Sequence, residues 1–225
     1  MRWLWIDRVL VHEPRRRLVA IKAVSLAEEH LHDHFPSENG LEPFPVMPGC
    51  LILEGMAQTA GILVGAASGF REKVVLAKIS SASLTDDALP GMLLRYEAII
   101  DRIDSTGAST TGVVDALDPA ALAGTSFAGT SSARTSSAEP RSVETAATER
   151  TAHAAGASAH EANAGAAVGA VAPLSGRDDG AWRRIATIDM LFSHLDRNLS
   201  GQDFPEENFV FSENFRTILA QLGVT

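Results

Sequence analysis

The sequence predicts an α+β fold in which an antiparallel sheet wraps around one long central helix. Residues 50–68 are apolar on nearly every side of a helix, so this helix needs cover. Segments rich in Val, Ile and Leu stand before and after it, and a sheet built from them supplies that cover. A chain of 225 residues with 45% hydrophobic residues is long enough to bury such a core in one domain.

The first half of the chain predicts a hairpin followed by the central helix. Residues 3–12 and 17–25 are rich in branched and aromatic side chains and flank a turn at Glu13-Pro14-Arg15. A short helical turn follows at 26–34. The central helix begins after Pro48, which we place near the first helical position, where its missing N–H costs nothing.

The second half predicts the remaining strands and a terminal helix. Four strand-like segments are expected, at residues 73–84, 92–104, 108–117 and 181–195. The last element is an amphipathic helix at 213–222. We expect it to dock on the core through Phe215, Ile218 and Leu219.

An insertion separates the last two strands. Residues 1–117 hold the first part of the domain, and residues 181–225 hold its last strand and a C-terminal extension. Residues 118–180 are rich in Ala, Ser, Thr and Gly. Ordering roughly 60 such residues would cost on the order of 90 kcal/mol, and alanines bury too little surface to offset this cost. We therefore expect the insertion to be disordered.

Composition excludes several classes of function. A net charge of −9 argues against nucleic acid as a partner, because nothing supplies a broad basic face. The longest apolar run is interrupted by Glu54 and Gln58, so no membrane segment is expected, and the first residues do not resemble a signal peptide. The one cysteine, Cys50, reads as a small buried hydrophobe, and no Cys/His spacing predicts a metal site. These features predict a cytoplasmic protein.

Glu54 is the anomaly of the central helix. Burying an ionised carboxylate costs several kcal/mol unless the carboxylate is paired. Glu54, Gln58, Gly61 and Gly65 stand at i, i+4, i+7 and i+11 and share one face, polar at one end and nearly free of side chains beyond. Either the glycines permit close helix packing and Glu54 meets an arginine, or this face is a narrow channel for an extended ligand with an acid at its head.

Three motifs in order favour the channel. His34, the last of three histidines that begin at His30, opens the motif His-Phe-Pro; PVMPG follows at 45–49 and LILEGMAQ at 51–58. Together they resemble the signature of the β-hydroxyacyl-acyl carrier protein dehydratases of fatty acid synthesis, the FabZ type of the hotdog fold. The first hairpin and the Leu-Pro-Gly at 89–91 are also similar to that family. The resemblance covers about residues 1–117 and 181–195.

The resemblance implies a fold, an assembly and a site. It implies a hotdog homodimer, alone or as a trimer of dimers, with His34 of one subunit as base and Glu54 of the other as acid. The Gly49 N–H would polarise the thioester carbonyl, the Val46 carbonyl would hold the His34 ring, and Gln58 would bond near the acid. The implied reaction removes water from 3-hydroxyacyl thioesters on acyl carrier protein to give trans-2-enoyl thioesters. It needs no metal or redox cofactor.

The residue types suit this chemistry. A neutral imidazole is a suitable base for the weakly acidic C2 proton, and a carboxylic acid in apolar surroundings keeps the proton that the leaving hydroxyl needs. A glutamate at position 54 resembles the FabZ type rather than the isomerising FabA type, although Cys50 resembles the latter and leaves isomerisation open.

Two features keep alternatives open. The loop at 37–44 is longer than the family's usual connection, so it is either a lid or a disturbance of the site. A hotdog thioesterase and a non-catalytic acyl-binding protein are the competing functions. An acidic carrier protein also requires a local basic patch. The candidate residues are Arg15, Arg16, Arg17, Arg71, Lys73, Lys78, Arg183 and Arg184.

Overall fold

The computed structural model describes residues 4–32, 35–122, 141–142, 181–195 and 208–224. The strands are β1 (Arg8–Glu13), β2 (Arg17–Ala23), β3 (Val74–Leu84), β4 (Leu93–Ile103), β5 (Gly107–Leu117), β6 (Arg141–Ser142) and β7 (Trp182–His194). The helices are α1 (Glu29–His32), α2 (Gly49–Ala67), α3 (Pro119–Leu122) and α4 (Glu213–Gln221).

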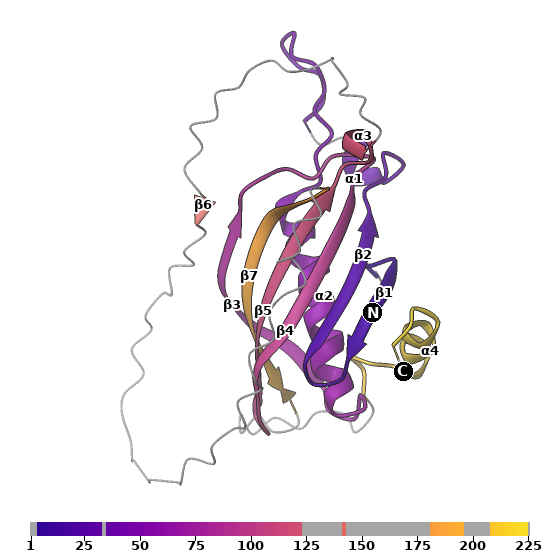
Figure 1. Cartoon of the computed structure of the whole chain (residues 1–225), viewed down its shortest axis with the longest axis vertical. Coiled ribbons are helices and arrows are strands. Elements are labelled where there is room, and N and C mark those ends of the chain that lie inside the picture. Colours follow the sequence, from indigo (N-terminus) through magenta and orange to yellow (C-terminus); the bar gives the residue numbers. More distant parts are fainter. Residues whose placement is uncertain (1–3, 33–34, 123–140, 143–180, 196–207, 225) are drawn as a thin grey trace.

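The strands form one antiparallel sheet that curls around α2. Their order is β1-β2-β4-β5-β7-β3-β6, so the strand that follows α2 returns to the edge of the sheet opposite β1. Figure 1 shows α2 behind the curled strands, along the length of the sheet. The predicted hotdog fold is confirmed.

Two predicted boundaries differ from the structure for local reasons. The first strand begins at Arg8 rather than at residue 3, because the Trp5 N–H is donated to the side chain of Gln58 on α2 rather than to a neighbouring strand. Pro48 is the N-cap residue of α2, one position before the predicted one, and its carbonyl accepts the first hydrogen bond from Leu51 N at 2.9 Å.

The inner side of α2 packs very closely on the middle of the sheet. A Cβ placed on Gly55 would lie 2.5 Å from Cζ of Tyr96, a fully buried side chain on β4. Opposite, Gly112 on β5 leaves room for Met56, whose Sδ would lie 2.3 Å from a Cβ there. These two glycines, one on each layer, bring the helix and the sheet into close contact.

The outer side of α2 is open in the single chain. Cys50 and Glu54 are exposed, so the predictions of a helix buried on nearly every side and of a buried Cys50 are wrong for one chain. The reason is geometric, since one curled sheet covers only one side of a helix. By length and composition α2 could cross a membrane, but 56% of its most apolar window is buried inside the fold, as in a core helix.

The predicted insertion is described only in part. Helix α3 follows β5 directly, and β6 pairs with the end of β3 through Ser83 and Leu84. These two short elements are an exception to the predicted disorder. The rest of the insertion lies outside the described residues, so its disorder stays a prediction.

The C-terminal extension docks on the fold as a helix. Ser212 caps α4 by accepting a hydrogen bond from Phe215 N, and Phe215 and Leu219 are buried. Ile218 is 43% exposed, so its predicted docking role is wrong. The carbonyl of Leu222 accepts a hydrogen bond from Val9 N at 3.0 Å, and Figure 1 shows α4 beside β1. The extension therefore covers part of the β1 edge of the sheet.

The close contact at Gly55 predicts a large cost for a single methyl group. We expect Gly55→Ala to lower the free energy of unfolding by about 1–3 kcal/mol, because the added Cβ meets the buried Tyr96 ring. Gly61→Ala is the matched control on the same helix, since its Cβ would lie 3.4 Å from the Phe192 ring and alanine favours a helix by up to about 1 kcal/mol. Urea unfolding measures both; equal destabilisation would contradict the prediction.

Candidate active site

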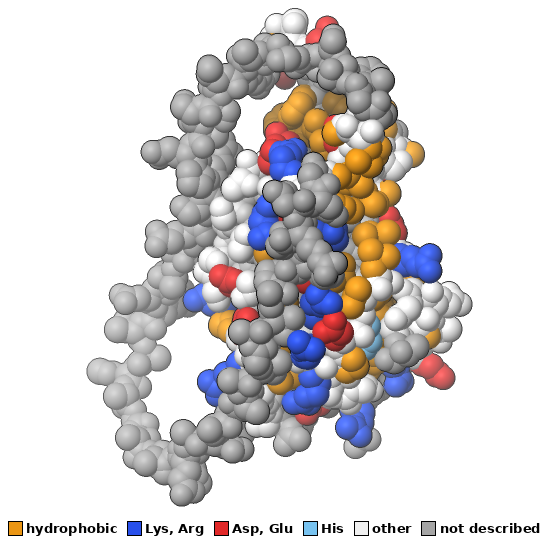
Figure 2. Space-filling view, viewed as in Figure 1, with side chains coloured by type: hydrophobic (Ala, Val, Ile, Leu, Met, Phe, Trp, Pro, Cys, Tyr) orange, Lys and Arg blue, Asp and Glu red, His pale blue; other side chains and the backbone are white. Residues whose placement is uncertain are grey.

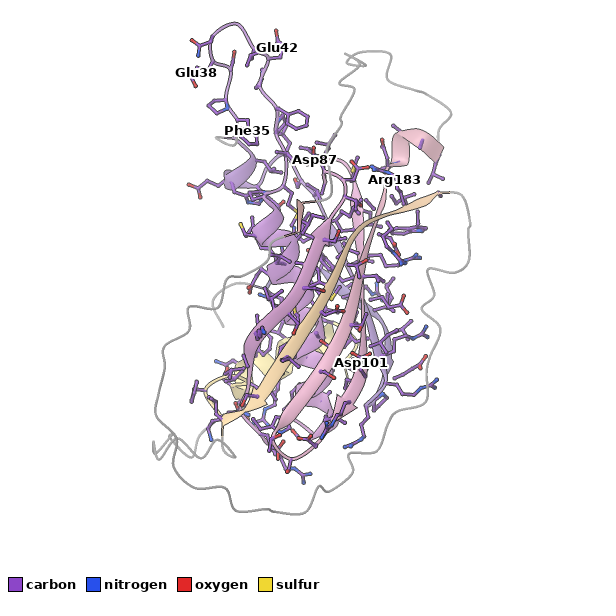
Figure 3. The ribbon with its side chains drawn as sticks, turned by 90° about the vertical axis from the view of Figure 1, so that its left-hand side faces the viewer. Phe35, Glu38, Glu42, Asp87, Asp101 and Arg183 are labelled. Carbon is purple, nitrogen blue, oxygen red and sulfur yellow. The ribbon has the colours of Figure 1, made fainter. Side chains whose placement is uncertain are left out.

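The loop after His34 folds into a small hairpin of its own. Asn39 and Gly40 both have positive φ, 54° and 77°, and Leu41 N donates to the Glu38 carbonyl at 3.0 Å. This is the turn that Asn-Gly favours between paired strands. At the base of the hairpin, Phe44 N donates to the Phe35 carbonyl at 3.0 Å, and Figure 3 shows the hairpin projecting from the end of the sheet.

The hydrogen bond at the base of this hairpin limits how far the longer loop can separate His34 from α2. Because the chain leaves at Phe35 and returns beside it at Phe44, the extra residues do not lengthen the path from His34 to α2 by their full number. His34 itself lies outside the described residues. Its distance to Glu54, and its predicted contact with the Val46 carbonyl, therefore stay predictions.

The PVMPG segment fixes the start of α2. Val46 and Met47 are buried, and Met47 N donates to the Ala88 carbonyl at 2.9 Å. Gly49 is the first helical residue, and a Cβ there would lie 2.8 Å from Cδ2 of Leu84 on β3. Pro48 supplies no side-chain cap. The first N–H groups of the helix are thus presented at a partly exposed position where anions and oxyanions bind favourably.

Glu54 and Gln58 are joined on one face of α2. Gln58 Nε2 donates to Glu54 Oε1 at 2.8 Å, and Gln58 Oε1 accepts from Trp5 N at 2.7 Å. Glu54 is exposed while Gln58 is 5% exposed. The buried amide is held at both ends, so it orients the carboxyl group of Glu54 and leaves Oε2 of that group without this contact.

Charged and aromatic side chains lie behind Glu54 and Gln58, and no sequence pattern predicted them. The Trp5 ring lies 5.2 Å from the His30 ring, between centroids, and the Lys22 Nζ lies 5.1 Å from the Trp5 ring centroid. Lys22 is itself buried and paired with Glu28. The residue types around Trp5 predict a strand, and a contact across 53 residues leaves no local pattern.

Tyr96 supports the helix beneath Glu54 but does not act as an acid. Its hydroxyl group is buried under Gly55 and has no hydrogen-bond partner among the described residues. Burial, with the negative charges of Asp7 and Glu28 nearby, raises the pKa of Tyr96 well above its ordinary value. The phenol therefore stays neutral and serves as packing.

The structure brings together four of the five predicted site residues on or beside one half of α2. Val46 and Gly49 form its start, and Glu54 and Gln58 follow on the next two turns. The arginine that would pair with Glu54 in the packing alternative is not found among the described residues; the amide of Gln58 takes that place. The structure therefore places the carboxyl group of Glu54 on the same half of α2 as the uncapped start of the helix.

The fold and the site together define a class of protein, which is a hotdog domain that carries a carboxyl group on its central helix. The chain belongs to the FabA-like domain family, which matches residues 1–118. It is 34% identical over 116 residues to the 3-hydroxyacyl-acyl-carrier-protein dehydratase FabZ of Ruminiclostridium cellulolyticum, covering 50% of this chain and 78% of that one. It is 44% identical over 96 residues to the FabZ of Symbiobacterium thermophilum, covering 42% and 63%.

Part of the chain lies beyond these matches. The chain spans less than two thirds of the Symbiobacterium relative, and the matched part is about half of this chain. Among solved structures, an acyl-CoA hydrolase mutant from Staphylococcus aureus aligns with 12% identity and a TM-score of 0.43, over 96% of this chain and 90% of that one.

The Gln58 contacts predict a measurable local loosening. We expect Gln58→Ala to lower the free energy of unfolding by about 1–3 kcal/mol, because it leaves the Trp5 N–H without its acceptor. Hydrogen exchange at the Trp5 amide should accelerate as well. Gln221→Ala, at the exposed end of α4, is the control. An unchanged exchange rate at Trp5 would show that the contact contributes nothing.

Proposed function

We propose that this protein dehydrates 3-hydroxyacyl thioesters on acyl carrier protein to trans-2-enoyl thioesters in fatty acid biosynthesis. The observation that carries the proposal is the carboxyl group of Glu54, oriented by Gln58, five residues after the helix start at Gly49 in a FabA-like domain. The relatives are 3-hydroxyacyl-acyl-carrier-protein dehydratases by name, which supports this activity.

The proposed reaction assigns one step to each group. A neutral His34 takes the proton from C2, and the Gly49 N–H stabilises the negative charge that develops on the thioester oxygen. Glu54 gives the proton on Oε2 to the C3 hydroxyl, which leaves as water. The amide of Gln58 holds Oε1, so that only Oε2 faces the substrate. No metal or redox cofactor takes part in this scheme.

A second copy of the chain would complete the site. The outer side of α2 carries Cys50, Glu54, Ala57 and Gly61, a row of small side chains around one acid that leaves space for a narrow channel between this helix and a second copy. Helix α4 hydrogen-bonds to β1, whereas residues 74–82 of β3 have no strand on their outer side within the described ranges. We therefore propose a dimer through β3 and α2, which covers Glu54 and brings His34 of the other copy to it.

An enoyl thioester assay tests the activity. Incubation with crotonyl thioester should reduce the enoyl absorbance without releasing thiol, because the proposed reaction is reversible and hydration is its reverse. We expect His34→Ala and Glu54→Gln each to lower the rate by about 10²–10⁴-fold, as loss of a general base or acid does. Thiol release would indicate a thioesterase, and no reaction would indicate acyl binding alone.

Mixing the two variants tests the shared site. If His34 and Glu54 meet across two subunits, a mixed dimer of His34→Ala and Glu54→Gln has one intact site. After unfolding and refolding together, random pairing leaves about a quarter of the sites intact, and activity should return to about that level. If both single variants are inactive and the mixture stays inactive, the site lies within one chain.

Several of the basic residues expected to receive the carrier protein are buried, paired or far from Gly49. Lys73 is buried, and Arg17 is held by Glu13 and Glu97. Arg15 and Arg71 donate to the last carbonyls of α2, at the end away from Gly49. Figure 2 shows Lys and Arg side chains on the face of the sheet turned away from α2, interleaved with acids.

Arg183 is the candidate nearest the proposed site. It pairs with Asp86, beside the end of β3 that contacts Gly49, and its side chain is 51% exposed. Figure 3 shows Arg183 near the same end of the sheet as Asp87. We propose acyl carrier protein as the partner, arriving at this end, and a cytoplasmic location, where that partner and the relatives' pathway would be found.

A charge reversal tests the carrier-protein contact. We expect Arg183→Glu to raise KM for an acyl carrier protein substrate by about three- to tenfold, because a rim charge affects encounter with an acidic partner. KM for the same acyl group on pantetheine should not change. Arg16→Glu is the control, since its side chain is 52% exposed and lies at the other end of α2. Equal effects of the two variants would contradict the proposal.

A further inference from the structure

The face of α2 that carries Glu54 is open at one end and closed at the other. Beyond Glu54 this side of the helix presents small, uncharged residues as far as Gly61, which is partly exposed and has the Phe192 ring beside it, 3.4 Å from where a Cβ would lie. Gly65 follows on the same face, about 16 Å along the axis from Glu54. Gly65 is buried, because an aromatic ring from another part of the chain lies on it.

That ring belongs to Phe211 in the C-terminal extension. A Cβ on Gly65 would lie 2.6 Å from both Cε2 and Cζ of Phe211, so the ring fills the space that any side chain at position 65 would take. Phe211 is 2% exposed. Its ring centroid lies 5.0 Å from that of Phe70 and 6.1 Å from that of Phe215.

Asn208 fixes the segment that presents Phe211. Its Nδ2 donates to the carbonyls of Phe70 and Glu72, at 2.9 and 3.1 Å, just after the end of α2. Its Oδ1 accepts from the backbone N–H groups of Val210 and Phe211. One side chain therefore ties the extension to the end of α2 and sets the position of the Phe211 ring.

We infer that Phe211 is the stop that limits the length of the acyl chain. This inference rests on the proposed function, in which the thioester lies at Gly49 and the C3 hydroxyl at Glu54. An acyl tail that follows the apolar face of α2 from there passes Gly61 and meets the Phe211 ring at Gly65. The ring is rigid, buried and clamped, so tails that reach it are rejected rather than accommodated. Phe211 thus determines specificity without touching the reacting atoms.

The test compares length profiles. Hydration of trans-2-enoyl thioesters of increasing even chain length is measured on the full chain and on Phe211→Ala. The unaltered protein should show a sharp fall in kcat/KM beyond one length, since a site that excludes a single further methylene discriminates by about tenfold or more. Phe211→Ala should move that fall to longer chains and leave kcat/KM for crotonyl thioester unchanged. Phe209→Ala, an exposed neighbour at 49%, should keep the original limit.

Two further variants keep the test decisive if Phe211→Ala fails to fold. Phe211→Leu keeps the site apolar but removes the ring, and Asn208→Ala releases the clamp; both should move the limit in the same direction. A uniform fall in rate at every length, or an unchanged limit in variants that remain folded, overturns the inference. If the unaltered protein hydrates no enoyl thioester of any length, the proposed function itself has failed.

Discussion

The structure depends on a single constraint, which is that one curled sheet covers only one side of α2. The close approach at Gly55 and Gly112 seats the helix against the middle of the sheet, and Tyr96 and Met56 fill the space between them. The opposite side then has no cover within the chain. Glu54 stands on that side. An acid on the uncovered side of a core helix costs little in a single chain, and the proposed dimer would bury it, so the proposed assembly and the proposed chemistry depend on the same residue.

The hydrogen bonds of Gln58 explain how an exposed acid keeps a defined orientation. An isolated glutamate on a helix surface samples several rotamers, and fixing it costs side-chain entropy. Here the amide of Gln58, which is already buried and fixed by the Trp5 N–H, holds the carboxyl group of Glu54 and reduces this cost. The strand at the start of the chain therefore ends its pairing at Arg8, and the segment before it serves the site. The late start of β1 and the orientation of Glu54 therefore both depend on the contact between Trp5 and Gln58.

Sequence patterns predicted the elements well where burial alternates along one strand or one helix. The bounds of β3, β4, β5 and β7 lie within one residue of the expected ones, and the spacing of Glu54 and Gln58 predicted that they share one face, where the structure joins them by a hydrogen bond. The patterns failed where exposure depends on parts that are distant in sequence or on another chain. Cys50 and Ile218 look like core residues by type, and only the three-dimensional arrangement shows that each faces outward. The Trp5 contact had no local signal at all.

The C-terminal extension makes the two edges of the sheet different. At β1 it hydrogen-bonds to the strand through Leu222, and at the end of α2 it places Phe211 on Gly65. The first contact hinders pairing at β1, and for this reason the proposed association of two copies uses β3. The second contact closes the Glu54 face at one end. A segment outside the family match thus occupies part of the β1 edge and covers α2 at Gly65. In the proposed dimer and acyl site, both contacts would act without any change in the residues around Glu54.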